Sequence, residues 1–372
     1  MKITIVRGRT TDASIYKIAD ALHSFGYTVD LLLWDRKNNL NVKQLNYHVV
    51  KFNFKAAENK FSSVLFFPVW WLFEFIELLK SDADVIHATD LDTLMPAILV
   101  KIIKRKKLAY SILDFYANNL PRIRPYPLTD LIRSLVASIE KFGIRFTDVL
   151  FLVDERRIEE VRGAKINKIN YIYNTPPDIY HNRTRDEPAG RGFTIFFAGG
   201  LVKGRGLEYM IKAIQNIDGV KLVIAGPGTD NELAACKAID ANKKIEFIGW
   251  LPTYEEVLKY SMKADLLFRF NDPSLPSNRY GSPNKLFEAM MCGIPILINS
   301  EFAASSLIEK EDCGVMVPYG DVEAITLAIT SLIKDPDRCK KLGANGRKAY
   351  EERYSWVIME KRLKDSYTSL YN

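Results

Sequence analysis

The chain has 372 residues, of which 48% are hydrophobic and 26% are charged, as expected of a globular protein in water. This length accommodates two domains of ordinary size. The four cysteines, at positions 236, 292, 313 and 339, show no CxxC spacing, and only four histidines are present. A zinc site and a disulfide framework are therefore not indicated, and a reducing cytoplasm is the expected location.

The positive charge lies in the first half of the chain. Residues 1–175 contain 26 Lys and Arg against 19 Asp and Glu, whereas residues 176–372 contain 26 of each, so the net charge of +7 belongs to the first half. Such a surface can face nucleic acid, an anionic membrane, a phosphorylated acceptor or only water. Because no nucleic-acid motif accompanies the charge, we expect no nucleic-acid partner and favour the membrane and phosphate interpretations.

The N-terminal segment has the order strand, loop, helix, strand. An apolar strand at Lys2–Val6 precedes the loop Arg7–Thr11, a helix is predicted over Ser14–Phe25, and a second strand follows at Val29–Trp34. This order is typical of a doubly wound α/β domain. The first strand is also too short and too soon charged for a secretory signal. No GxGxxG follows the first strand, so a dinucleotide is not implied.

The most apolar stretch is Phe61–Lys80. Pro68, Glu74 and Glu77 interrupt it, which argues against a membrane span. Two interpretations stay open: an interfacial helix, since Trp and Phe favour that zone, or an ordinary core helix that leads into a strand at residues 84–87. The later segment Lys101–Lys107 has five cations in seven residues at a predicted helix end.

Asp114 ends the next predicted strand, Leu108–Asp114. The carboxyl ends of strands are where open α/β sheets bind ligands, so Asp114 is a candidate site residue. The alternative is that Asp114 only caps the turn that follows. Further on, a helix is predicted over residues 130–146 and strands over 149–153 and 169–173, and a polar, Pro-rich linker over 176–192.

A second α/β unit begins with the strand Phe193–Ala198, followed by the glycine-rich loop GGLVKGRG. Its glycine amides can approach an anion closely, and Lys203 and Arg205 can neutralise it. An ordinary connector with two surface cations is the alternative. Strands are predicted at residues 220–225, 245–249 and 264–269, and the last helix at 354–371.

The most informative stretch is Asn278–Asn299. Ser282-Pro283 is a good helix start, Cys292-Gly293 ends the helix, and residues 294–298 form a short apolar strand. A helix N-terminus attracts anions, and Asn284 and Lys285 add polar and cationic groups to the first turn. Glu288 can accept hydrogen bonds from two vicinal hydroxyls of a ribose, or it simply faces water.

The segment SPNKLFEAMMCGIPIL resembles the donor-binding segment of retaining glycosyltransferases of the GT-B fold, specifically the large family 4. The resemblance implies that Glu288 binds the ribose of a nucleotide sugar. Many relatives have a second Glu eight positions earlier, where this chain has Tyr280. The segments DASIYKIADALHSFGYTVDLL and DVIHATDLDTL also resemble family segments.

The loop GGLVKGRG resembles the family's diphosphate loop, with Gly200 in place of its Arg and Arg205 in place of its Lys. Asp114 matches an acidic position next to a family His, where this chain has Leu113. We therefore expect Asp114 to be catalytic. The expected donor-binding residues are Gly8, Gly200, Lys203, Arg205, Trp250, Leu251, Tyr280, Gly281, Ser282, Asn284, Lys285, Leu286 and Glu288.

The resemblance implies an α/β protein of GT-B fold, with two doubly wound Rossmann-like domains facing across a cleft. Residues 1–175 would form the acceptor-side domain, residues 176–192 the linker and residues 193–353 the nucleotide-sugar domain, with helix 354–372 packing back on the first. No cofactor and no metal are expected, because loop amides and cations can stabilise the leaving diphosphate.

The implied reaction is retaining transfer of a sugar from a UDP- or GDP-linked donor to a glycan or a lipid-diphosphate-linked acceptor, in cell-surface polysaccharide or glycolipid synthesis. The implied location is the cytoplasm or the inner face of the cell membrane, with an anionic membrane surface as a partner. Because Gly200, Leu113 and Tyr280 depart from the family pattern, a nucleotide-binding protein without transferase activity, or a nucleotide-sugar epimerase, remains the alternative.

Overall fold

The computed structural model describes residues 1–10, 13–40, 45–56, 65–120, 126–179, 192–275, 278, 280–281 and 284–371. The chain divides into two compact units. The N-terminal unit comprises Met1–Tyr173 together with Met359–Asn372, and the C-terminal unit comprises Asn174–Ile358. Most of the expected linker, 176–192, lies outside the described residues.

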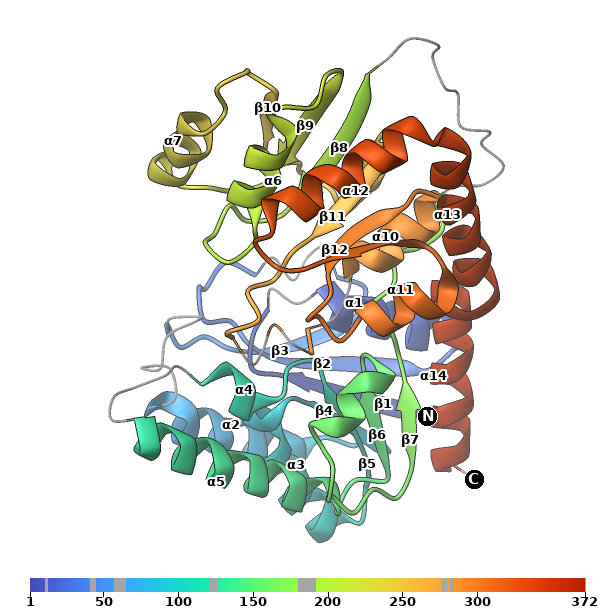
Figure 1. The fold of residues 1–372 in the computed structure, drawn as a ribbon. Helices are drawn as coiled ribbons and strands as arrows, with labels where there is room; N and C mark the ends of the chain where they lie inside the picture. The colour runs from blue at the N-terminus through green and yellow to red at the C-terminus, as the bar shows by residue number, and fades with distance from the viewer. Residues whose placement is uncertain are drawn as a thin grey trace. The chain divides into compact units, whose positions relative to one another are not determined.

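The N-terminal unit is built on a seven-stranded parallel sheet with the order β3-β2-β1-β4-β5-β6-β7 (Figure 1). Successive strands are added on one side of β1, toward β3, and then on its other side, from β4 toward β7. The order of strand addition therefore reverses between β1 and β4, which makes this pair the topological switch point. The strands are β1 (Lys2–Arg7), β2 (Thr28–Trp34), β3 (His48–Phe52), β4 (Val85–Thr89), β5 (Lys107–Ile112), β6 (Val149–Leu152) and β7 (Ile169–Tyr171).

Helices cover this sheet, and α2, α3 and α5 lie side by side along it (Figure 1). Alternation along β4 places Ile86 and Ala88 in the core with α2 and α3, whereas His87 contacts Tyr367 of the last helix, α14. The helices are α1 (Ala13–Ser24), α2 (Phe67–Lys80), α3 (Leu91–Lys104), α4 (Tyr116–Asn119), α5 (Tyr126–Ile144), the 3₁₀ helix η3 (Glu155–Glu159) and α14 (Trp356–Tyr371).

Within the predicted apolar stretch Phe61–Lys80, residues 61–64 lie outside the described residues and residues 67–80 form α2, one face of which is a core face. Trp70 is fully buried and stacks on Trp34 of β2, with ring centroids 5.7 Å apart. The opposite face exposes Val69, Leu72 and Ile76. The core-helix interpretation is therefore correct for one face, while the other face stays apolar toward solvent. Of the helices that the structure describes, none has a stretch long and apolar enough to cross a lipid bilayer.

The C-terminal unit repeats the architecture with a six-stranded parallel sheet, in the order β10-β9-β8-β11-β12-β13. Its switch point lies between β8 and β11. The strands are β8 (Phe193–Ala198), β9 (Val220–Ala225), β10 (Ile245–Gly249), β11 (Leu266–Arg269), β12 (Ile296–Asn299) and β13 (Gly314–Val317).

The helices of this unit pack in two sets, α6 against α12 and α10 against α8 and α13. Apolar side chains of α6 and α12 form one core with β8, β9 and β11. The helices are α6 (Leu207–Ile214), α7 (Asp230–Ala238), α8 (Tyr254–Met262), α10 (Asn284–Cys292), α11 (Ser305–Glu311), α12 (Val322–Lys334), α13 (Pro336–Ala349) and the π-helical turn η4 (Tyr350–Tyr354).

The two doubly wound sheets confirm the predicted fold class, with small errors at element ends. The helix predicted over 130–146 begins at Tyr126 and ends at Ile144, and the strand predicted over 294–298 is Ile296–Asn299. The edge strand His48–Phe52 was missed. It is short and only half-buried, so its apolar pattern is weak.

Candidate functional site

Glu288 is buried in the middle of α10, with 2% of its surface exposed. Leu286, Phe287 and Met290 surround it in sequence and are core residues. Its Oε1 accepts a hydrogen bond from the Tyr254 hydroxyl at 3.0 Å, and its Oε2 accepts one from the Lys285 ammonium at 2.5 Å. The interpretation that Glu288 simply faces water is therefore wrong. Each oxygen keeps lone-pair capacity for one more donor.

The residues that lead into α10 lie next to this carboxylate in the chain. Tyr280, Gly281, Asn284 and Lys285 are half-buried, and Ser282 lies outside the described residues. Leu286 is 1% exposed, which makes it a core residue rather than a polar contact. The helix therefore brings Glu288 and the Lys285 cation together within its first turns, a pairing that was not predicted from the sequence.

The loop after β8 is shaped by its glycines. Gly206 precedes α6 with φ +66°, in the left-handed region, and a Cβ there would lie 2.6 Å from the Cβ of Phe270. Gly204 also has φ +88°. Arg205 is half-buried between them, whereas Lys203 is exposed. The two glycines on either side of Arg205 thus lie against Asp272 and Phe270, which follow β11.

At Gly200 the loop has room for a side chain. A Cβ there would meet nothing closer than 3.8 Å. The glycine is therefore not required by packing. Lack of space therefore does not explain why the arginine that the resemblance places at position 200 is absent.

Two polar residues at the end of β11 were missed by the sequence interpretation. Arg269 is half-buried, and its Nε has no hydrogen-bond partner among the described residues. Asn271 is 2% exposed, and neither polar atom of its side chain has such a partner. Burial, with the nearby Arg205 charge adding to it and Glu288 opposing it, lowers the pKa of Arg269 to about 10.

Tyr254 was also not identified from the sequence. It lies 34 residues from Glu288 in the chain, so no local pattern connects the two residues.

Trp250 and Leu251 follow β10 at the edge of the same sheet. Trp250 is 70% exposed, and Leu251 is half-buried. Since the six strands are parallel, β8, β10 and β11 all end at the same edge of the sheet. Arg205, Arg269 and Trp250 therefore all lie at this one edge of the sheet, and the donor-binding role of Trp250 stays a prediction.

The switch point of the N-terminal unit carries a charged cluster. Gly8 follows β1, and a Cβ there would lie 2.0 Å from Oδ2 of Asp92, so a glycine is needed for this close approach. The same Asp92 oxygen lies 3.4 Å from the guanidinium of Arg36. The absence of a side chain at Gly8 therefore leaves room for the Arg36–Asp92 pair at the end of β1.

Asp90 organises the neighbouring loop. Its carboxylate pairs with Arg7 and accepts hydrogen bonds from the amides of Leu113, at 2.8 Å, and Asp114, at 3.2 Å. Burial favours its neutral form, but the Arg7 and Arg9 guanidinium groups outweigh burial and lower the pKa of Asp90. The loop after β5 is thereby fixed to the loop after β4.

Asp114 lies in that loop, two residues past β5. Its side chain is 49% exposed and lies 3.8 Å from Arg9. Burial of part of the carboxyl, with the Asp90 charge nearby, raises the pKa of Asp114. The alternative that Asp114 caps the next helix is wrong, because Phe115 occupies the N-cap of α4 and no side chain caps it. Its catalytic role stays a prediction.

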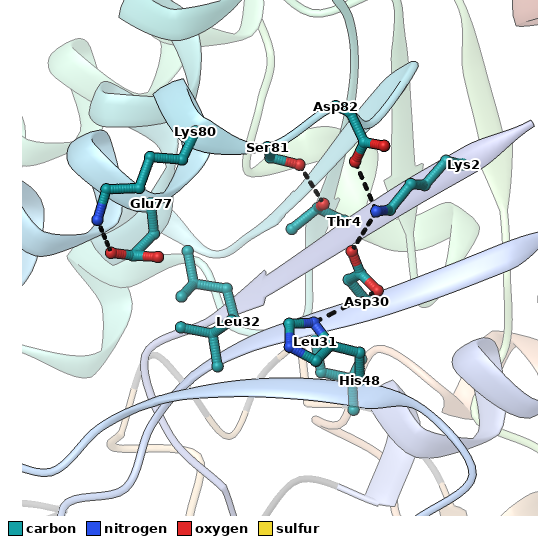
Figure 2. Close-up of a pocket in the computed structure, with 11 residues that line it drawn as sticks. Lys2, Thr4, Asp30, Leu31, Leu32, His48, Glu77, Lys80, Ser81 and Asp82 are labelled. Atoms are coloured by element: carbon teal, nitrogen blue, oxygen red, sulfur yellow. Dashed lines mark hydrogen bonds and ion pairs between the residues drawn. The ribbon is translucent and has the colours of Figure 1, made fainter.

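A pocket of about 220 Å³ lies at the opposite edge of the N-terminal sheet (Figure 2). Lys2, Asp30 and His48 line it at the amino ends of β1, β2 and β3. Lys2 pairs with Asp30 at 3.1 Å and with Asp82 at 2.5 Å. The pocket lies away from the carboxyl ends of the strands, where open sheets bind ligands, and it is smaller than typical ligand pockets. Across the described ranges, no group of three or more His, Cys, Asp or Glu side chains is arranged to hold a metal ion.

The comparisons with known proteins agree with this geometry. Residues 181–349 match the family model "Glycosyl transferases group 1". The chain is 23% identical over 212 residues to the capsular polysaccharide biosynthesis glycosyltransferase CapM of Staphylococcus aureus, covering 56% of this chain and 53% of that protein. It is 26% identical over 174 residues, 44% of each chain, to a GDP-mannose-dependent phosphatidylinositol monomannoside mannosyltransferase of Corynebacterium glutamicum. The chain thus aligns with about half the length of these curated relatives.

Solved structures match over nearly the whole chain. The sucrose-phosphate synthase of Thermosynechococcus elongatus superposes with a TM-score of 0.77 at 16% identity, covering 100% of this chain and 99% of that one. Anabaena HepE in complex with UDP gives 0.71 at 16% identity, covering 99% and 100%. At this identity the likeness shows the fold. The chain therefore has the GT-B fold, with two doubly wound sheets, and its segment 181–349 is similar to the glycosyl transferases group 1.

Proposed function

We propose that the protein is a glycosyltransferase that transfers a sugar, with retention at the anomeric carbon, from a nucleoside-diphosphate sugar to a glycan or lipid-linked acceptor. The observation that carries this proposal is the buried Glu288 of α10, which lies inside the matched segment and accepts hydrogen bonds from Tyr254 and Lys285. A carboxylate with free lone pairs next to a cation can accept hydrogen bonds from the vicinal hydroxyls of a ribose.

UDP- and GDP-sugars are the donors that fit the proposal. The HepE structures were solved with UDP and with UDP-glucose, and the mannosyltransferase relative is GDP-mannose-dependent. Arg205 and the amides of the glycine loop after β8 would stabilise the diphosphate as it leaves, without a metal or other cofactor.

A surface glycan or a lipid-linked acceptor is supported by the relatives. Their names include capsular polysaccharide, lipopolysaccharide core and phosphatidylinositol mannoside biosynthesis. We place the reaction at the inner face of the cell membrane, where a lipid-linked acceptor would lie. The net charge of +7 in residues 1–175 would bring the protein to anionic lipid.

A second function follows from the departures at Gly200, Leu113 and Tyr280. A nucleotide-binding protein without transfer activity, or a nucleotide-sugar epimerase, would tolerate them. Incubation with UDP-, GDP- and dTDP-sugars, with and without a pool of membrane acceptors, separates the three. Transfer releases nucleotide only with acceptor, and epimerisation changes the sugar without net release of nucleotide. A mere binder leaves the nucleotide sugar intact.

The control for this assay is Glu288→Gln, which keeps the size of the side chain but lacks the charge. We expect it to abolish most nucleotide release. If wild-type protein binds the donors but releases no nucleotide with any acceptor pool, the transferase proposal is wrong.

A further inference from the structure

Two arginines stand at the switch point of the C-terminal sheet. β8 and β11 are neighbouring parallel strands, paired through Leu266 and Ile195, and the chain winds away from them in opposite directions. Arg205 lies in the loop after β8, and Arg269 is the last residue of β11. Open α/β sheets bind their ligands at this place, outside the carboxyl ends of the two strands.

The backbone holds the two arginines next to each other. The amide of Asp272 donates a hydrogen bond to the carbonyl of Gly204 at 2.9 Å. Gly206 contacts Phe270 so closely that no Cβ would fit between them. Arg205 lies between these two glycines, and their partners Phe270 and Asp272 are the first and third residues after Arg269. The loop and the strand end therefore pack together in one junction.

The junction holds positive charge without a matching carboxylate. Within the described part of the chain, no Asp or Glu lies within ion-pair distance of Arg205 or Arg269, and the carboxylate of Glu288 is already bonded to Tyr254 and Lys285. Burial lowers the pKa of Arg205, and burial together with the Arg205 charge lowers the pKa of Arg269. An arginine nonetheless stays protonated in a protein. Two neighbouring guanidinium groups of this kind are stabilised when an anion binds between them.

Uncommitted polar atoms lie at the same strand end. The Nε of Arg269 and both side-chain polar atoms of Asn271 are buried without a hydrogen-bond partner among the described residues. Buried polar atoms normally have a partner, and a set of them without one indicates that a ligand supplies it. The planar fork of a guanidinium suits a phosphate oxygen pair.

We propose that Arg269 is the second cation of a diphosphate site, acting with Arg205 on the nucleoside-diphosphate part of the donor, in the place of the arginine that the resemblance assigns to position 200. This inference rests on the proposed function for the identity of its ligand. It explains why the loop tolerates Gly200, since the charge comes from β11 instead. It also adds a residue outside the loop that sequence comparison alone would search.

The test compares wild type with Arg269→Gln by calorimetric titration of UDP, GDP and their bare nucleosides. We expect the diphosphates to bind at least tenfold more weakly to Arg269→Gln and the nucleosides to bind within twofold of wild type. Arg205→Ala should give the same pattern. Arg338→Gln, an exposed arginine on α13 of the same unit, is the matched control and should bind all four ligands normally. Equal losses for diphosphate and nucleoside, or no loss, would overturn the inference.

A rescue variant separates binding from structure. Gly200 has space for a side chain, so Gly200→Arg combined with Arg269→Gln should recover at least threefold of the lost diphosphate affinity. Arg269→Lys keeps the charge without the fork and should lie between wild type and Arg269→Gln, which leaves a readout if Arg269→Gln does not fold. Ligand-free Arg269→Gln should melt at or above the wild-type temperature, because a like charge has been removed from the junction.

Inorganic pyrophosphate distinguishes this inference from the proposed function. If wild type binds pyrophosphate in an Arg269-dependent way but binds no nucleotide, the anion site stands and the nucleotide-sugar function fails. If it binds neither, the inference fails as well. If it binds nucleotides with no dependence on Arg269, only the inference is wrong.

Discussion

Glu288 shows what a single buried carboxylate can do on an apolar helix. Both of its oxygens are held, by Tyr254 and by Lys285, so its position is fixed before any ligand arrives. Pre-positioned groups lose little conformational entropy on binding. This geometry favours a role in recognition over a role in folding, because a buried ion pair by itself contributes little to stability.

We predict that Glu288→Gln and Glu288→Ala weaken binding of UDP or GDP at least tenfold, about 1.4 kcal/mol, through loss of charged hydrogen bonds to the ribose. Glu288→Ala should also lower the melting temperature, because the partly buried Lys285 ammonium loses its partner. Titration calorimetry and thermal unfolding measure the two effects. Tyr254→Phe keeps the carboxylate and should bind within about threefold of wild type. Unchanged affinity in a folded Glu288→Gln would contradict the ribose assignment.

In the N-terminal unit, Asp114 is the candidate catalytic residue. It is half-exposed beside Arg9, its pKa is raised, and it caps no helix. We predict that Asp114→Asn lowers kcat about 10²-fold or more, the usual contribution of one acid–base group, while donor affinity stays intact. Initial rates and calorimetry give the two quantities. Near-normal turnover would mean that the carboxylate has no part in the chemistry.

At the scale of elements, α5 presents an apolar stripe to solvent. The stripe consists of Leu128, Leu131, Leu135, Ile139 and Phe142, whose spacing places them along one side of a helix. Each is at least 41% exposed. Ile102 and Ile103 on the neighbouring α3 are also exposed, beside the exposed cations Lys104 and Arg105. Apolar side chains next to cations suit the interface of an anionic bilayer.

We predict that the protein binds anionic vesicles and that the stripe carries the apolar part of this binding. Co-sedimentation should rise with the fraction of anionic lipid and fall as salt screens the cations. Leu131→Gln combined with Leu135→Gln should weaken binding at least tenfold, whereas Leu327→Gln, an exposed leucine on α12, should have no effect. Binding that salt does not change would assign attachment to apolar contact alone, and no binding would favour a soluble acceptor.

At the scale of the whole molecule, the last helix is tied to the first unit through a buried histidine. The Nδ1 of His87 lies 2.6 Å from the Tyr367 hydroxyl, and its Nε2 lies 2.6 Å from the Ser111 hydroxyl. Burial lowers the pKa of His87 to about 3. The contact joins residues 280 positions apart and places α14 on the sheet that the chain began.

We predict that this histidine makes the protein less stable in mild acid. The unfolded chain takes up a proton near pH 6.5 that the folded chain refuses until about pH 3, so stability falls as the pH falls through this window. Between pH 7 and pH 5 the loss is about 2 kcal/mol. Urea unfolding of wild type and His87→Gln at both pH values isolates it. The buried Glu74 and Glu140 have raised pKa values and act in the opposite direction, so the difference between the two proteins is the measure. Equal pH slopes would exclude the assignment.

The sequence by itself determined the local features. Apolar runs bounded by glycine and proline predicted most strands, because burial on both faces of a parallel sheet requires such runs. The turn residues around Gly206 and the spacing of α10 identified the loop and the helix that carry Arg205 and Glu288. These signals are short-range, since they depend on neighbours within one or two turns of chain.

Only the tertiary structure decided which distant residues meet. Tyr254 reaches Glu288 across 34 positions, and Arg269 reaches the Arg205 loop because β8 and β11 are neighbours in the sheet. No local pattern marks Arg269, which reads as the polar end of a strand. The burial of Glu288 and the outward direction of the α5 stripe likewise depend on what packs against each helix. Periodicity gives the faces of a helix, but the partner surface determines which face is covered.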